Sequence, residues 1–345
     1  NMMFKRFFFS TIGGTIASAF AGITMAYIGM GVWALVAQQL SNALMDTLIL
    51  WITVKWRPKM IFSWQRLKAM LSYGWKLLVS SLLDTIYNNL RNLVIGKIYS
   101  AVDLAYYNQG DRFPKLIVTN INTSIDSVLL PTMSRAQDEK NHVKSMTQRA
   151  IKTSTYVMAP LMMGLAFCGV PIIKLILTDK WLPCVPFLRI FCITYMFYPI
   201  HTANLNAIKA MGRSDLFLKL EVMKKIMGMA ILLSTMWFGV MAMAYSLLLG
   251  SVLSQIINSW PNRKLLNYGY LEQLKDILPG ILLAVFMGVC VYFVGYIKLP
   301  TILVLIVQII VGAIMYIGLS VVLKLEAFEY LCGMLKNMLN KKKRK

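Results

Sequence analysis

The stretch SSLLDTIYNNLRNLVIGKI, residues 80–98, decides how this sequence folds. It is apolar enough for a membrane-spanning helix, yet it carries Asp84, Asn88, Arg91 and Asn92. Residues spaced by three or four positions share one face of a helix, so these four side chains form a single polar face. Such a face is costly in lipid unless it meets protein or a water-filled cavity. The stretch therefore predicts a membrane helix that lines a polar pathway and is more than an anchor.

The composition of the whole chain is that of an integral membrane protein. Of its 345 residues, 58% are hydrophobic, a share well above that of soluble domains. A net charge of +22 would indicate a nucleic-acid-binding protein in a soluble chain. Here the basic residues lie in short loops between apolar runs, which is typical of membrane topology, so we expect no nucleic-acid partner.

Ten apolar runs have about the twenty residues that a helix needs to cross a bilayer. They cover residues 7–28, 30–54, 74–96, 113–134, 153–176, 185–208, 217–238, 240–260, 277–297 and 300–323. We therefore predict an all-α polytopic membrane protein with about ten transmembrane helices.

Loop charges predict the orientation of these helices. Every second loop, together with the two termini, holds 28 of the 36 Lys and Arg residues, whereas the intervening loops hold seven. Basic residues concentrate on the cytoplasmic side of membrane proteins, so we expect both termini in the cytoplasm. Residues 55–76 are basic, carry no acid and are interleaved with aromatic residues, which suits either a helix lying on the membrane surface or an ordinary basic loop.

Nothing in the sequence indicates a metal or redox cofactor. The five cysteines are scattered, none forms a Cys-x-x-Cys pair, and only two histidines accompany them. The chain begins NMMFKRFFF, without a signal-peptide cleavage pattern. We expect a fragment whose start lies upstream.

Polar side chains recur on the other predicted helices. On the helix predicted over residues 30–54, one face carries Gln38, Asn42 and Asp46. On the helix predicted over residues 7–28, the small residues Gly14, Ser18 and Gly22 recur every four positions, so a neighbouring helix can approach that face closely. Small residues at that spacing indicate packing and not chemistry.

Three ionisable residues at membrane depth suggest function. Asp126 lies on the helix antiparallel to that of Asp84, at a similar depth, so the two carboxylates could share a proton. Alternatively one of them pairs with Arg91, which would be a structural contact. His201 follows Pro199, which can bend its helix beside a polar cavity. A functional role and a structural role for His201 both remain open.

Several segments together resemble a known family. They are GVWALVAQQL (31–40), LLDTIYNN (82–89), LAYYNQGDRFPKLI (104–117), LPTMSRAQDE (130–139), LILTDKWLPCVPFLRI (175–190) and NLNAIKAMGRSDLFLKLEVMKK (204–225). The chain resembles, over residues 1 to about 335, the Wzx-type polysaccharide flippases of the multidrug/oligosaccharidyl-lipid/polysaccharide (MOP) superfamily, especially the colanic-acid and O-antigen branch.

The resemblance implies a division of the chain into domains. Members of the family have fourteen helices, in two six-helix lobes and a trailing pair, and this chain would correspond to helices 5–14. Residues 1–54 would be the last two helices of the N-lobe, 55–73 a basic amphipathic cytoplasmic linker, 74–260 the six-helix C-lobe, 261–323 the trailing helices and 324–345 a basic cytoplasmic tail. The first four helices of the family are missing here.

The resemblance also implies a function: transfer of an undecaprenyl-diphosphate-linked oligosaccharide, an O-antigen or exopolysaccharide repeat unit, across the bacterial inner membrane by alternating access. The expected substrate-cavity residues are Arg91 as the cation for phosphate, and Asn88, Asn92, Asn204 and His201. The candidates for H⁺ or Na⁺ coupling are Asp84, Asp126 and Asp46. We expect no cofactor, a monomer in contact with membrane lipids, and polysaccharide polymerase machinery as a partner.

Two other functions fit the same sequence. One is a drug or small-ion antiporter of the same superfamily. The other is an intramembrane glycan-modifying enzyme with His201 as its base, although no nucleophile is visibly paired with that histidine. On balance we predict that the protein is not an enzyme.

Overall fold

The computed structural model describes residues 4–53, 62–297 and 299–343. These residues form helices and connecting turns, with no strand among them, which confirms the predicted all-α fold. The chain divides into two compact units, unit 1 (Asn1–Val79) and unit 2 (Ser80–Lys345).

Unit 1 contains the hairpin of α1 (Phe4–Tyr27) and α2 (Val32–Thr53) and the first part of α3 (Trp64–Ile98). Gly29 and Gly31 form the turn of the hairpin with φ angles of +83° and +53°, which glycine adopts at little cost. The predicted linker, residues 55–73, lies partly outside the described residues, and from Trp64 onward it is helical and continuous with α3.

Close packing joins α1 to α2 where the sequence predicts it. A Cβ atom at Gly14 would lie 2.6 Å from Asn42 Oδ1 and from Asp46 Oδ1, and one at Gly22 would lie 3.2 Å from the Cβ of Gln38. The small residues of α1 therefore face the polar side chains of α2, and the packing role predicted for this face is confirmed.

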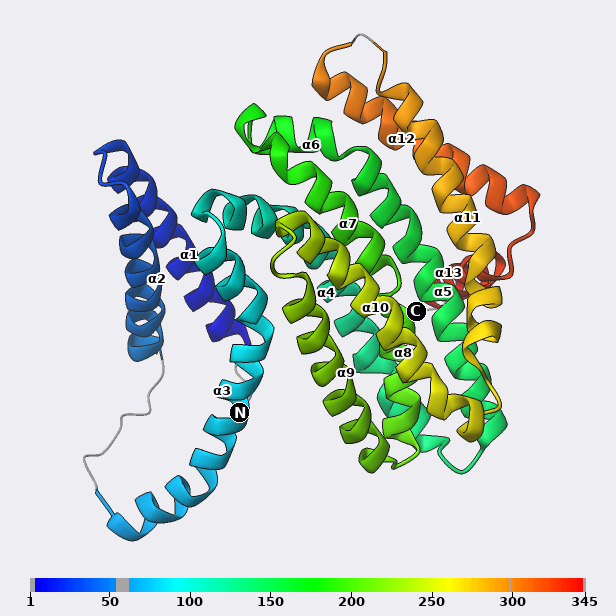
Figure 1. Ribbon diagram of the computed structural model, residues 1–345, viewed down its shortest axis with the longest axis horizontal. Helices are drawn as coiled ribbons and strands as arrows, with labels where there is room; N and C mark the ends of the chain where they lie inside the picture. The colour runs from blue at the N-terminus through cyan, green and yellow to red at the C-terminus, as the bar shows by residue number, and fades with distance from the viewer. Residues whose placement is uncertain (1–3, 54–61, 298, 344–345) are drawn as a thin grey trace. The chain divides into compact units, whose positions relative to one another are not determined.

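Unit 2 begins within α3 and is a bundle of long helices (Figure 1). Its further elements are α4 (Ala101–Arg135), α5 (Lys140–Phe167), α6 (Gly169–Ile176), the 3₁₀ helix η1 (Asp179–Cys184), α7 (Val185–Met196), α8 (Tyr198–Ala210), α9 (Ser214–Thr235), α10 (Val240–Leu265), α11 (Tyr270–Val294), α12 (Thr301–Val322) and α13 (Glu326–Lys343).

The predicted span boundaries differ from the observed helices for local reasons. The helix predicted from residue 113 begins at Ala101, because Ser100 and Asp103 form a capping box in which Asp103 N donates to Ser100 Oγ at 3.0 Å. The predicted span 153–176 is a pair of helices, α5 and α6, bent by 68°. Pro171, near the start of α6, has no N–H to continue the hydrogen bonding of α5 across the bend.

Four helical segments among the described residues are long and apolar enough to cross a membrane, or five if the bent pair α5–α6 is one span. The four are Asp179–Ala210, Val240–Leu265, Tyr270–Val294 and Thr301–Val322. Helices α3 and α4 are as long but carry the polar faces described below. A helix that lines a hydrated interior needs fewer apolar residues than one surrounded by lipid.

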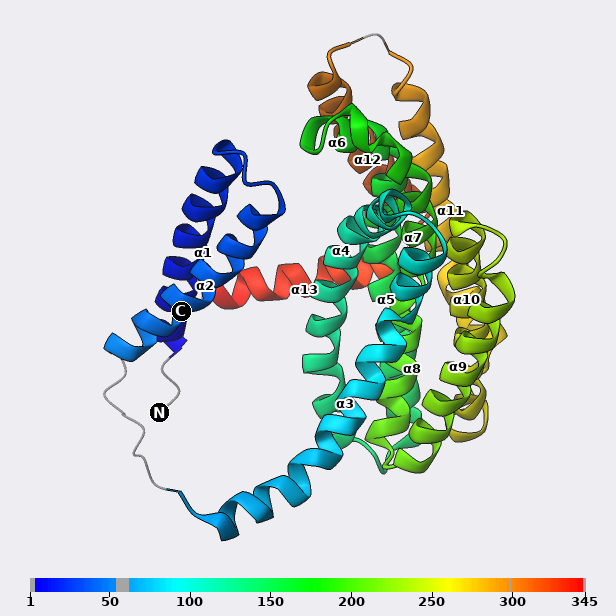
Figure 2. The same ribbon diagram turned by 60° about the vertical axis from the view of Figure 1, so that its left-hand side comes forward.

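Helix α5 lies in the centre of unit 2. It packs against α4, α7, α8 and α11, and α11 in turn pairs with α12 (Figure 1). Its buried Met158 and Met162 form a core with Leu188 of α7 and Ala284 of α11. On another side of the bundle, α9 and α10 form a hairpin next to α8 (Figure 2).

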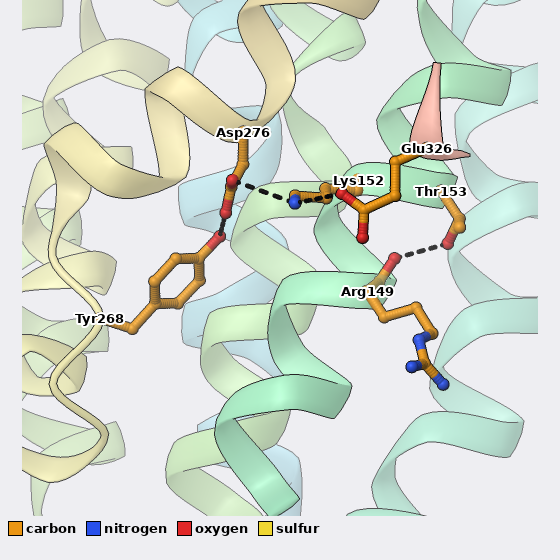
Figure 3. Close-up of polar contacts among 6 residues, drawn as sticks. All are labelled: Arg149, Lys152, Thr153, Tyr268, Asp276 and Glu326. Atoms are coloured by element: carbon orange, nitrogen blue, oxygen red, sulfur yellow. Dashed lines mark hydrogen bonds and ion pairs between the residues drawn. The ribbon is translucent and has the colours of Figure 1, made fainter. Parts of the chain in front are cut away.

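An ion-pair network connects three helices of unit 2 (Figure 3). Lys152 Nζ of α5 lies 3.3 Å from Asp276 Oδ1 of α11 and 2.8 Å from Glu326 Oε2 of α13. Tyr268 donates a hydrogen bond of 2.7 Å to the other oxygen of Asp276. The lysine thus bridges two carboxylates and holds α11 and α13 to the central helix.

Candidate functional site

A cavity of unit 2 with a volume of about 550 Å³ lies along the polar face of α3. Tyr87, Asn88 and Arg91 of α3 line it. Its other polar wall residues come from α4, α7, α8, α9 and α10: Asp126, Thr194, Tyr195, Tyr198, His201, Thr202, Asn206, Lys209, Glu221, Lys224, Ser246, Ser251, Ser254 and Asn258. A polar cavity inside a bundle of membrane helices is a place where water and hydrophilic groups can reside.

Arg91 is fixed in the wall of this cavity by α10. Its Nη1 donates to the Met243 carbonyl and, at 2.9 Å, to Ser246 Oγ. Ser246 in turn donates to the Met243 carbonyl at 2.8 Å. One edge of the guanidinium is therefore held by protein, while the residue still lines the cavity. The planar group can offer its remaining N–H donors to an anion there.

The acids near this face have other partners than the sequence suggests. Asp84 forms an ion pair with Lys225 of α9, and Asp126 Oδ1 accepts a hydrogen bond of 2.7 Å from Asn206 Nδ2. In the described part of the chain no hydrogen bond or ion pair joins either acid to Arg91 or to the other acid. Asp84 is thus paired with Lys225 where the sequence suggested Arg91, and a proton shared between the two acids stays a prediction. Helical spacing identifies which residues share a face, but it does not reveal which neighbouring helix meets that face.

His201 lines the cavity but is only 8% exposed. Its Nδ1 lies 3.0 Å from Asn258 Nδ2 and its Nε2 lies 3.5 Å from Ser251 Oγ. Since an amide nitrogen can only donate, Nδ1 accepts and the proton of a neutral ring resides on Nε2. A histidine that acts as a general base is usually oriented by a third group, such as a carboxylate. Among the described residues, no carboxylate forms a hydrogen bond with the His201 ring.

Asn204 lies in a buried amide network between α8, α10 and α11. Its Nδ2 donates to Gln273 Oε1 at 2.8 Å and to Ser259 Oγ at 3.3 Å, and its Oδ1 accepts from Asn262 Nδ2 at 2.6 Å. The residue is 0% exposed and is not among those that line the cavity. These contacts fit a structural amide that connects helices.

Two further predicted site residues lie away from the cavity wall. Asn92 is half-buried on α3 but does not line the cavity. Asp46 belongs to unit 1, where it packs beside Gly14 and its Oδ1 has no hydrogen-bond partner.

Three charged cavity residues are not predicted by the sequence. Lys209, Glu221 and Lys224 line the cavity, although none of them is among the site residues expected from the sequence. Lys224 Nζ lies 2.6 Å from Glu221 Oε1, and Lys209 Nζ lies 4.5 Å from the ring centre of Phe217. Arg91 is therefore not the only cation that faces the cavity. The predicted helix 217–238 already contains Glu221 and Lys224, so the signal available in the sequence was the presence of two charged residues inside an apolar run.

Comparison with known proteins identifies relatives of this chain. It is 24% identical over 311 residues to the lipopolysaccharide biosynthesis protein WzxC of Escherichia coli, covering 88% of this chain and 61% of WzxC. It is 22% identical over 282 residues to the teichuronic acid biosynthesis protein TuaB of Bacillus subtilis, covering 79% of this chain and 58% of TuaB. The chain thus spans about three-fifths of the length of these relatives.

The fold is also similar to that of a solved structure, the lipid II flippase MurJ in an inward closed conformation. The TM-score is 0.70 at 16% sequence identity, and the match covers 90% of this chain and 66% of MurJ. The sequence profile of one family, described as polysaccharide biosynthesis protein, matches residues 1–186. Since this match extends over more than half of the sequence, the chain belongs to the polysaccharide biosynthesis protein family.

Proposed function

We propose that this chain forms the cavity-bearing part of a flippase for a lipid-linked oligosaccharide. The observation that carries the proposal is the cavity of about 550 Å³, which has cations, amides and hydroxyl groups in its wall. A diphosphate with attached sugars cannot cross hydrocarbon without polar partners. A hydrated cavity with donors for phosphate and sugar supplies them, and the lipid tail stays in the bilayer.

The cavity wall supports specific roles for its residues. Arg91 would contact the diphosphate, because its guanidinium can form paired hydrogen bonds to phosphate oxygens. Lys209 and Lys224 add positive charge to the same wall. Asn88 and the pair of His201 and Asn258 would bind sugar hydroxyls, since amides both donate and accept hydrogen bonds.

Asp126 is the best placed of the three candidates for ion coupling, because it lines the cavity. Asp84 is paired with Lys225, and Asp46 lies in unit 1. Coupling to H⁺ or Na⁺, alternating access, the undecaprenyl carrier, a polymerase partner and the monomeric state stay predictions.

The function is tested by the lipid-linked intermediates of a strain that lacks the gene. We expect lipid-linked oligosaccharide to accumulate on the inner leaflet of the cytoplasmic membrane, because the head group is made there and no longer crosses. Labelling with an impermeant reagent in intact cells and in inverted vesicles distinguishes the two leaflets. Unchanged amounts on both leaflets, with altered drug sensitivity, would instead indicate an antiporter.

The orientation of the chain follows from its loop charges, and we propose that both termini lie in the cytoplasm of a bacterial inner-membrane protein. A C-terminal alkaline phosphatase fusion, which is active only in the periplasm, should then be inactive. The same reporter placed between Ile297 and Thr301 should be active. The reverse pattern would overturn this topology.

A further inference from the structure

A second cavity of unit 2, of about 360 Å³, shares no wall residue with the first. Its wall comprises residues of α5, α6 and α7 together with the facing ends of α11 and α12. Figure 1 shows α6 at the same end of the bundle as the connection between α11 and α12. The bend of 68° between α5 and α6 lies beside this cavity, because Phe167 and Val170 on either side of it line the wall.

One cation in this wall is available to a ligand. Arg189 Nε donates to the carbonyl of Ala166, beside the bend, at 3.3 Å. Its two terminal nitrogens have no hydrogen-bond or ion-pair partner in the part of the chain that the structure describes. Lys174 also lines the cavity, but it is paired with Asp179 at 3.2 Å. A guanidinium fixed through one nitrogen can present the other two to an anion such as phosphate.

A buried polar group in the same wall lacks a partner. Gln308 of α12 is 2% exposed, and its Nε2 donates to the Val291 carbonyl at 3.0 Å. Its Oε1 has no hydrogen-bond partner. A buried acceptor that receives no hydrogen bond destabilises the folded protein. A hydroxyl group or a water molecule that donates to this oxygen would remove that cost. Gly295 lets the amide of Gln308 pack closely against the backbone of α11, because a Cβ atom there would lie only 3.1 Å from Gln308 Nε2.

The rest of the wall combines the hydroxyl groups of Tyr292, Tyr296 and Thr301 with apolar side chains, some of which reach the outer surface of the bundle. Val170, Ile297 and Leu299 are 37%, 49% and 44% exposed. In a membrane protein such side chains contact lipid tails. The cavity therefore brings an exposed guanidinium and a buried acceptor without a partner next to apolar side chains at the surface of the bundle.

We propose that this cavity binds the head group of a lipid that carries a phosphate next to a hydroxyl group. Arg189 contacts the phosphate, Gln308 Oε1 accepts from the hydroxyl, and the apolar side chains at the surface contact the first part of the tail. Two kinds of lipid have this chemistry: an anionic phospholipid of the bilayer, such as phosphatidylglycerol, and a polyprenyl diphosphate sugar. The proposal does not depend on the function proposed for the first cavity.

The test is a titration of the purified full chain in detergent, followed by native mass spectrometry. The probes are dioctanoyl phosphatidylglycerol, farnesyl diphospho-N-acetylglucosamine, dioctanoylglycerol, which lacks phosphate, and glycerol 1-phosphate, which lacks a tail. We expect only the first two to bind, and Arg189→Gln to weaken that binding by about tenfold or more, as for loss of a charge-assisted hydrogen bond. Arg112→Gln removes an exposed arginine outside the cavity and should leave binding unchanged.

Hydrogen exchange locates the binding and keeps the test decisive. Bound lipid should protect amides around the α5–α6 bend and at the facing ends of α11 and α12. Gln308→Leu should weaken lipid binding in the same way. If that variant does not fold, the comparison of Arg189→Gln with Arg112→Gln tests the proposal by itself. The lipid that binds more tightly identifies the occupant. Equal binding of the probe without phosphate or of the probe without a tail, or equal effects of Arg189→Gln and Arg112→Gln, would overturn the proposal.

Discussion

Replacing Arg91 with alanine is expected to reduce export of lipid-linked oligosaccharide by about 10- to 100-fold, because a charge-assisted contact to phosphate contributes on the order of 1.5–3 kcal/mol. Arg91→Lys keeps the charge but loses the planar group that can bind two oxygens at once, so an intermediate loss is expected. The measurement is surface polysaccharide in a deletion strain that expresses each variant, normalised to the amount of protein in the membrane.

The controls for this experiment come from the contacts of Arg91 itself. Ser246→Ala removes the hydrogen bond that holds the guanidinium but leaves its charge in the cavity, so most export should remain. Lys219→Gln removes an exposed cation of α9 that does not line the cavity and should have no effect. If Arg91→Ala exports normally, or if Ser246→Ala is as defective as Arg91→Ala, the arginine only connects α3 to α10.

Asp126→Asn should instead alter how export depends on pH or on the ion gradient.

Asn204→Leu is expected to destabilise the protein by about 2–3 kcal/mol, because it leaves several buried hydrogen-bonding groups on α10 and α11 unpaired. The partners that lose a hydrogen bond are Asn262, Ser259 and Gln273. The midpoint of thermal unfolding in detergent should fall by several degrees. Export per folded molecule should change little, because Asn204 does not line the cavity.

The matched variant is Asn88→Leu, which changes an asparagine in the cavity wall in the same way. Asn88 is exposed, so its loss should leave thermal stability nearly unchanged and impair export. The two asparagines should therefore show opposite patterns. If Asn204→Leu is stable but inactive, the result would instead support the role in substrate binding that we expected for Asn204 from the sequence.

The polar face of α3 could be predicted from the sequence, because helical periodicity alone brings Asn88 and Arg91 to one side. The same reasoning predicted that Gly14 lies on a face which a neighbouring helix approaches closely, and the structure shows that this neighbour is the face of Asn42 and Asp46. Apolar length likewise predicted an all-α membrane fold, since backbone groups in lipid must form their hydrogen bonds within helices. These features depend on short-range geometry and on the solvent that surrounds the chain.

Only the tertiary structure decided which polar residues face a shared cavity and which face each other. Asn204 and Asn206 are two positions apart, yet Asn204 is enclosed by amides of α10 and α11 while Asn206 holds Asp126 at the cavity wall. Lys225 pairs with Asp84, whereas its neighbour Lys224 faces the cavity. Spacing along a helix defines its faces, but the partner of each face depends on the packing of helices that are distant in sequence. The sequence therefore determined the polar helices, and the packing of the bundle determined their contacts.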